Sequence, residues 1–246
     1  MRDQYLQFRQ LHQPLIRQLA LLFSFVVLGA CARAPVVLIG SAELPERVEL
    51  EGVPFFPQDD YQCGPAALAT MLAQRGVDTG PEQLVERVYL PSRKGSLQVE
   101  MVAAARAHDL LVYPVEPRLE ALLVEVAAGN PVLVLQNLAF DRWPRWHFAV
   151  VVGYDLTTQT IVLRSGTTRR WKGSFRQFER SWAKGDRWAR VTVTPDQLPR
   201  AAKETVWLKA ASDLEQTGRV DAARQAYTAA AERWSSGLPL FALANS

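Results

Sequence analysis

Hydrophobic positions in the first half of the chain recur mainly with helical spacing. The first such stripe begins near Cys63, has Pro65 in its first turn and stops at Gly76. Proline is harmless in a first turn, where its missing N–H would have no helical partner. The pattern predicts helices over 63–76, over 81–88, after Ser96 as an N-cap and over 119–128, and an alternating strand over 111–115.

The pattern changes after Gly129 to β-branched, apolar runs separated by turn residues. These runs predict strands over 132–135, 148–154, 160–163 and 190–194, with one short helix over 175–182. Helices therefore come first and strands second, an order that favours an α+β fold with an antiparallel sheet over alternating α/β.

Residues 201–246 return to helical spacing with many small side chains. They fit the helix–turn–helix pattern of a tetratricopeptide-like repeat, with Gly218 near the turn. The positions that carry this pattern are Trp207, Ala210, Ala211, Leu214, Ala223, Tyr227 and Ala230. Residues from Pro239 resemble the start of another helix, so the repeat is interpreted as incomplete. Such a repeat would offer a surface to a protein partner; the alternative is an ordinary helical hairpin that caps the main domain.

Residues 1–31 have the pattern of an export signal. Arg2, Arg9 and Arg17 precede an apolar run over 19–27, which is shorter than the roughly 20 residues of a membrane span. The alternative is a single-pass anchor that is retained. Residues 32–52 then form a tether and a first strand, with the apolar run 36–39.

The end of the signal, Leu-Gly-Ala-Cys over 28–31, resembles the lipobox of bacterial lipoproteins. The resemblance implies a mature chain that starts at lipidated Cys31 and is held at the membrane by its acyl chains. It places the protein on the periplasmic face of the cell envelope, and Ala32 after the lipid site implies the outer membrane.

Charge and cysteine content narrow the function classes. The chain has a formal charge of +3, of which residues 1–30 carry +2. The remaining net charge of +1 does not indicate a surface that binds nucleic acid. Lipidation of Cys31 would leave Cys63 as a lone thiol in an oxidising compartment, which is a candidate reactive group, although buried inert cysteines are common. No zinc site or phosphate loop is apparent, so no metal or cofactor is expected.

Cys63 at a helix start and His147 at the start of a strand are the two halves of a thiolate–imidazolium pair. A helix N-terminus and a nearby histidine lower a cysteine pKa and so favour the nucleophilic thiolate. The other histidines are His12, in the signal, and His108, for which a charged or solvated role at a helix end is expected.

Two sequence stretches carry a family resemblance. Residues 54–68 read PFFPQDDYQCGPAAL and residues 147–154 read HFAVVVGY. Together they resemble the bacteriocin-processing, double-glycine cysteine peptidases, a branch of the papain-like fold. The resemblance implies a papain-like domain over 53–195, a peptide or protein substrate, and Gln58 as an oxyanion donor beside the Cys63 N–H.

The same family places an Asp or Asn on the strand that follows the histidine strand. Asp155 lies about 26 Å from His147 along one strand at about 3.3 Å per residue, too far to orient the ring. A hairpin over 156–159 instead returns the chain near His147 at Ser165. A hydroxyl accepts a hydrogen bond from imidazole but supplies no charge.

The sequence thus predicts a lipid-anchored cysteine peptidase that acts through Cys63, His147 and Gln58, with Ser165 in the third position. The alternatives are an inactive peptide-binding or scaffold lipoprotein and a papain-like amidase or acyltransferase acting on cell-wall peptides. The aromatic and basic loop over 141–146 either lines a substrate cleft or packs its rings into the fold.

Overall fold

The computed structural model describes residues 44–58 and 62–246. The predicted signal, the lipidation site Cys31 and the apolar run over 36–39 lie outside the described residues. Within the described part, no helix has the length and apolar character needed to cross a lipid bilayer.

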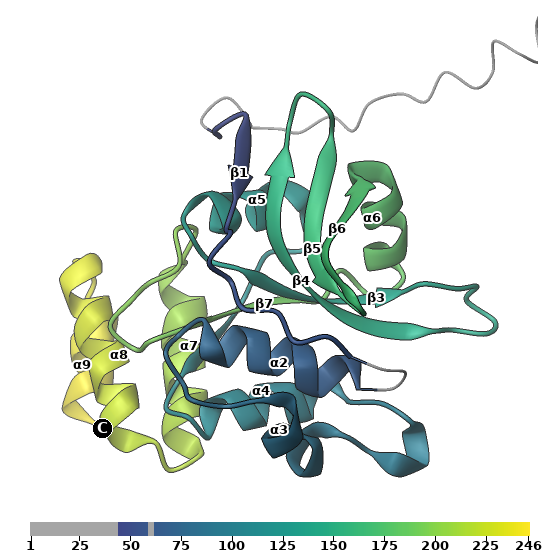
Figure 1. Cartoon of the computed structure of the whole chain (residues 1–246). Helices are drawn as coiled ribbons and strands as arrows, with labels where there is room; N and C mark the ends of the chain where they lie inside the picture. The colour runs from purple at the N-terminus through teal and green to yellow at the C-terminus, as the bar shows by residue number, and fades with distance from the viewer. Residues whose placement is uncertain (1–43, 59–61) are drawn as a thin grey trace, which may run out of the picture. The chain divides into compact units, whose positions relative to one another are not determined.

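A seven-stranded antiparallel sheet lies at the centre of the described residues (Figure 1). Its order is β2-β7-β3-β4-β5-β6, and the short β1 pairs with the last residues of β4. The strands are β1 (Arg47–Glu49), β2 (Leu111–Pro114), β3 (Val132–Asn137), β4 (Trp146–Asp155), β5 (Thr160–Ser165), β6 (Thr168–Ser174) and β7 (Ala189–Val193). The predicted class, helices with an antiparallel sheet, is confirmed.

The helices fall into an N-terminal group, two single helices and a C-terminal group. They are α2 (Cys63–Ala73), α3 (Pro81–Val88), α4 (Gln98–Arg106), α5 (Leu119–Ala127), α6 (Phe175–Ala183), α7 (Glu204–Gln216), α8 (Val220–Arg233) and α9 (Gly237–Ala244), with a 3-10 turn over Pro91–Arg93. Figure 1 shows α2, α3 and α4 grouped beneath the strands, away from α5 and α6.

The main core lies between α2 and the sheet. Every residue of α2 from Gly64 to Leu72 is buried. On β4 the alternate residues Phe148, Val150 and Val152 join the same cluster, as expected where successive side chains of a strand point to opposite faces. Burial of each large side chain contributes roughly 1.5–3 kcal/mol, so this packing fixes the N-terminus of α2 against β4.

A buried arginine holds the segment that leads to Gln58. Arg164 on β5 is 5% exposed, and its guanidinium donates to the carbonyl oxygens of Val53 at 3.3 Å and Leu50 at 3.3 Å. It also donates to the carbonyl oxygen of Arg169 at 2.8 Å. These bonds compensate the desolvation of the cation and join the segment over 50–53 to β5.

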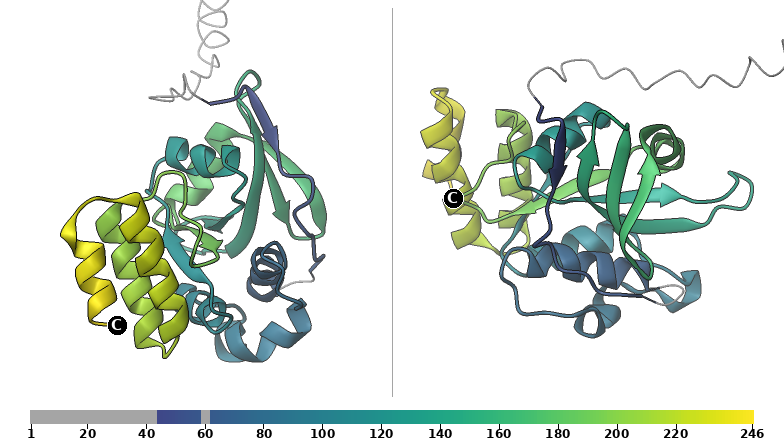
Figure 2. Two further views of the ribbon diagram at one scale, coloured as in Figure 1. Left: turned by 90° about the vertical axis from the view of Figure 1, so that its left-hand side faces the viewer. Right: turned by 45° about the horizontal axis from the view of Figure 1, so that its top comes forward.

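The C-terminal helices pack on the rest of the described chain. Figure 2 shows α7, α8 and α9 side by side, with Trp207 buried and donating from Nε1 to the carbonyl oxygen of Ala226 at 2.8 Å. Asp213 on α7 forms an ion pair with Arg106 of α4 at 2.9 Å. The helical hairpin is therefore docked, while its assignment as a tetratricopeptide-like repeat stays a prediction.

Two local predictions were wrong or incomplete. Ser96 is not the N-cap of α4, because Leu97 occupies that position, and Val99 is exposed while Met101 and Ala104 face the core. The strand β6 was not predicted. It is mostly polar and exposed and pairs only with β5 at the sheet edge, so it lacks the apolar alternation that identifies a half-buried strand.

Gly64→Ala should destabilise the chain by about 1–3 kcal/mol, the usual cost of overpacking. A Cβ at this position would lie 2.0 Å from Ser96 Oγ and 2.5 Å from Ser96 Cβ. Urea unfolding measures the loss. The control is Gly52→Ala, where a Cβ meets nothing within 4 Å, and the double variant Gly64→Ala/Ser96→Gly should recover most of the stability. No loss in the single variant would contradict the contact.

Candidate active site

Cys63 is the first residue of α2 and packs half-buried against the main core. Its sulfur accepts hydrogen bonds from the backbone N–H groups of Phe148 and Gly64. The bond from Phe148 places the sulfur beside the residue that follows His147 on β4. Burial raises the pKa of the Cys63 thiol, and the backbone donors offset this only in part.

His147 is held by the hairpin of β4 and β5. Its Nε2 lies 2.8 Å from Ser165 Oγ at the end of β5. On its other side His147 is in register with the buried Gln136 of β3. The structure therefore brings Ser165 to the imidazole, in the position expected from the hairpin over 156–159.

The electrostatics of this pair differ from the expected ion pair. Burial lowers the pKa of His147 to about 4, with a further contribution from the charge of Arg145. Since the pKa of Cys63 is raised, thiol and imidazole are both neutral at pH 7 in the free chain. Burial of both groups thus opposes the resting thiolate–imidazolium pair, which stays a prediction.

Asp155 is occupied at the far end of β4. It forms an ion pair with Arg47 of β1 and accepts a hydrogen bond from the Thr158 N–H at 2.9 Å. These partners lower its pKa to about 2. Asp155 therefore closes the β4–β5 turn and does not orient His147.

Gln58 lies at the end of the segment held by Arg164. Its side-chain Oε1 is buried and has no hydrogen-bond partner within the described part of the chain. Buried amide atoms are nearly always paired, and an amide offers a donor or an acceptor after a half-turn of its plane. This end of the Gln58 amide, five residues before Cys63, is therefore available to a ligand.

Ser96 was not singled out as a site residue by the sequence. Its buried hydroxyl lacks a partner among the described residues and lies against Gly64, next to Cys63. No signal in the sequence pointed to this contact.

His108 does not have the charged role expected at a helix end. It follows α4, and its Nε2 is buried without a partner in the described residues. Burial and the charges of Arg87 and Arg219 lower its pKa, so the neutral form is favoured.

The hairpin between β3 and β4 carries exposed aromatic side chains just before His147. Phe140 is 75% exposed, Trp143 69% and Trp146 51%. These rings do not pack into the described fold, so the packing interpretation of this loop is wrong. Exposed apolar groups next to a reactive pair suit contact with a ligand.

A cavity of about 470 Å³ opens beside Ser165. Its lining includes Gln136 and Trp171, together with the cationic residues Arg145, Arg180 and Lys184. The sequence did not reveal this cavity. Its residues lie on or beside β3, β6 and α6, just before β4 and at the end of β5, and these segments meet only in the folded chain.

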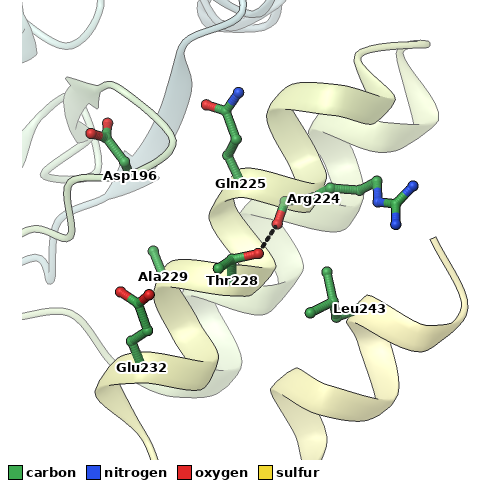
Figure 3. Close-up of a pocket in the computed structure, with 7 residues that line it drawn as sticks. All are labelled: Asp196, Arg224, Gln225, Thr228, Ala229, Glu232 and Leu243. Carbon is green, nitrogen blue, oxygen red and sulfur yellow. Dashed lines mark hydrogen bonds between the residues drawn. The ribbon is translucent and has the colours of Figure 1, made fainter.

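A second hollow, of about 490 Å³, lies at α8 and α9 (Figure 3). Asp196 lies opposite the α8 residues, and Thr228 donates to the carbonyl oxygen of Arg224 at 2.9 Å (Figure 3). Its lining in the described structure has neither cysteine nor histidine, so it lacks the nucleophile and base of the Cys63 region.

Comparison with protein families identifies the class of this site. Residues 50–189, more than half of the chain, match the Peptidase_C39 like family. The chain belongs to this family of cysteine peptidases. The match spans Gln58, Cys63, His147 and Ser165. A search of curated protein sequences gives no significant match.

Several solved structures are similar to this chain, and one of them aligns well enough to show the same fold. A C39-like peptidase from Bacillus anthracis aligns with a TM-score of 0.52 at 18% identity, over 63% of this chain and all of its own. A double-glycine motif protease from an AMS/PCAT transporter, solved with a leader peptide, has 20% identity over 59% of this chain and 94% of its own, with a TM-score of 0.43. The peptidase domain of Streptococcus ComA has 17% identity over 57% and 98%, with a TM-score of 0.45.

Acidification should destabilise the chain through His147. Its pKa is about 4 when folded and 6.5 by the ordinary value, so between these pH values mainly the unfolded state is protonated. The contribution of His147 to the free energy of unfolding is therefore complete above pH 6.5. It falls by about 3 kcal/mol as the pH drops toward 4, at about 1.4 kcal/mol per pKa unit.

Urea unfolding between pH 4.5 and 7 measures this dependence. His147→Gln should flatten the slope, whereas titration of His108 contributes equally to both proteins. Equal slopes in the wild type and His147→Gln would show that His147 is not buried in its neutral form.

Proposed function

We propose that this protein is a cysteine-type peptidase in which Cys63 is the nucleophile and His147 the general base. The observation that carries the proposal is the position of the Cys63 sulfur beside the Phe148 N–H, one residue after His147, whose ring contacts Ser165. A nucleophile, a base and an orienting group are the parts that covalent acyl transfer needs.

The resting neutrality of the pair sets the order of events. As the sulfur attacks the scissile carbonyl carbon, the thiol proton passes to His147, and the carbonyl electron pair moves to oxygen. His147 then returns the proton to the leaving amine nitrogen as the C–N bond breaks. Water hydrolyses the resulting thioester, with His147 again accepting a proton.

Gln58 and the Cys63 N–H are proposed to hold the oxyanion. The buried, unpartnered Oε1 of Gln58 supports this role, because a half-turn of the amide would direct its NH2 group, a donor, to the same place. Exposed Phe140, Trp143 and Trp146 support docking of an extended peptide beside His147. From the resemblance to double-glycine peptidases, the proposed substrate is a peptide cleaved after small residues such as double glycine.

A second function, peptide binding without efficient cleavage, is favoured by one specific observation. The partner of His147 is the uncharged Ser165, and the pKa of His147 is lowered rather than raised. An imidazolium formed during attack is therefore less stabilised than one beside a carboxylate.

The remaining proposals concern the chain's setting. Lipidation at Cys31 would tether the peptidase to the periplasmic face of the envelope, in the outer membrane. The docked helices α7, α8 and α9 would present a surface to a protein partner, as a tetratricopeptide-like repeat does.

Peptide libraries that include double-glycine leaders and cell-wall peptides test the function. The wild type should cleave a subset of them, Cys63→Ala should cleave none, and Gln58→Ala should lose about 10²–10³ in kcat. Gln225→Ala, on the exposed face of α8, is the matched control and should retain activity. Peptide binding by Cys63→Ala without any turnover by the wild type would favour the peptide-binding function. Transfer of the acyl group to an amine acceptor instead of water would favour the acyltransferase function.

Ser165→Asp should raise the pKa of His147 by about 1–3 units, because an adjacent carboxylate favours the imidazolium. We expect at least a tenfold gain in kcat/KM near pH 7. Ser165→Asn is the matched control, since it offers an acceptor without a charge. An equal gain in both variants would show that ring orientation, not charge, limits catalysis.

A further inference from the structure

The cavity beside Ser165 concentrates positive charge. Arg145 comes from the β3–β4 hairpin, Arg180 lies in α6, and Lys184 is the C-cap of that helix. In the described chain the lining includes neither Asp nor Glu. Lys184 reaches Asp141 at 3.4 Å and the carbonyl oxygen of Ala139 at 2.7 Å, whereas Arg145 and Arg180 have no carboxylate partner among the described residues. Two guanidinium groups are thus available to an anion.

The surrounding fold fixes the backbone from which these cations extend. Asn137 is buried, and its Oδ1 accepts hydrogen bonds from the backbone N–H groups of Ala139 and Arg145, each at 3.0 Å. Buried Gln136 donates from Nε2 to Ser181 Oγ of α6 at 2.6 Å. These bonds join the hairpin base to α6, so the cavity exists before any ligand enters.

Ser165 connects this cavity to the reactive pair. Its Oγ contacts His147 Nε2 at 2.8 Å, and the same residue lines the cavity. The charge of Arg145 already reaches the imidazole, because it lowers the pKa of His147. An anion held by Arg145 would have the opposite effect and raise the pKa of His147.

We propose that this cavity binds the carboxylate of an acidic side chain in the peptide substrate and thereby supplies His147 with the negative charge that Ser165 lacks. The inference rests on the proposed function for the identity of the ligand as a peptide. Guanidinium groups match a carboxylate with paired, charge-assisted hydrogen bonds. A substrate with Asp or Glu at the matching position would then complete the site as it binds.

Binding to the inert full-length Cys63→Ala protein tests the site apart from catalysis. The probes are C-terminally amidated peptides derived from a library member that the protein cleaves or captures. They come in pairs that carry either Glu or Gln at one position, and this position is moved along the peptide. At one position the Glu peptide should bind at least tenfold more tightly than its Gln counterpart. Arg180→Gln should remove this preference. Arg176→Gln, also on α6 but outside the cavity lining, is the matched control and should keep it.

Two further probes separate the sources of a carboxylate. Acetate alone and a neutral peptide with a free C-terminal carboxylate should not reproduce the affinity of the Glu peptide. Equal affinity for Glu and Gln peptides at every position, or a preference unchanged in Arg180→Gln, would overturn the proposal. A preference for the free C-terminus alone would also overturn it.

The effect on His147 is read by NMR titration of its ring in the same inert protein. The saturating Glu peptide should raise the pKa of His147 from about 4 by at least one unit, and the Gln peptide should not. An unmoved pKa with the Glu peptide bound would overturn the link to His147. Because these readouts need no turnover, their failure is distinct from a failure of the peptidase function itself.

Discussion

Burial of α2 against β4 is the constraint on which the candidate active site depends. The helix is enclosed over nearly its whole length, so its N-terminus has no freedom to move relative to the sheet. Phe148 belongs to the core that holds α2, and its N–H reaches the sulfur of Cys63. The packing that stabilises the fold therefore also sets the position of the nucleophile beside the histidine strand.

The same burial determines the protonation states. A thiol and an imidazole that are both shielded from water favour their neutral forms. Catalysis then requires that charge separation be stabilised only when the substrate is present. Two features of the structure relate to this need: the unpartnered Oε1 of Gln58, at the proposed oxyanion site, and the cationic cavity beside Ser165. In the proposed mechanism the substrate completes the electrostatics of the site.

Arg164 shows how the sheet edge and the site are joined. Its buried guanidinium is satisfied by backbone carbonyl groups of the segment over 50–53, which continues to Gln58, while its neighbour Ser165 contacts His147. Two neighbouring residues of β5 therefore connect the segment over 50–53 and the imidazole of His147 to the same strand.

The sequence by itself determined the elements whose signals are local. Pro65 in the first turn and Gly76 beyond the last turn marked the first helix, a β-branched apolar run marked the histidine strand, and the length of the hairpin brought Ser165 to His147. Tertiary structure alone decided the pKa directions, the partner of Gly64, the exposure of the hairpin rings and the cavity made by Arg145, Arg180 and Lys184. The physical reason is that burial and charge depend on residues far apart in the chain, which no local spacing encodes.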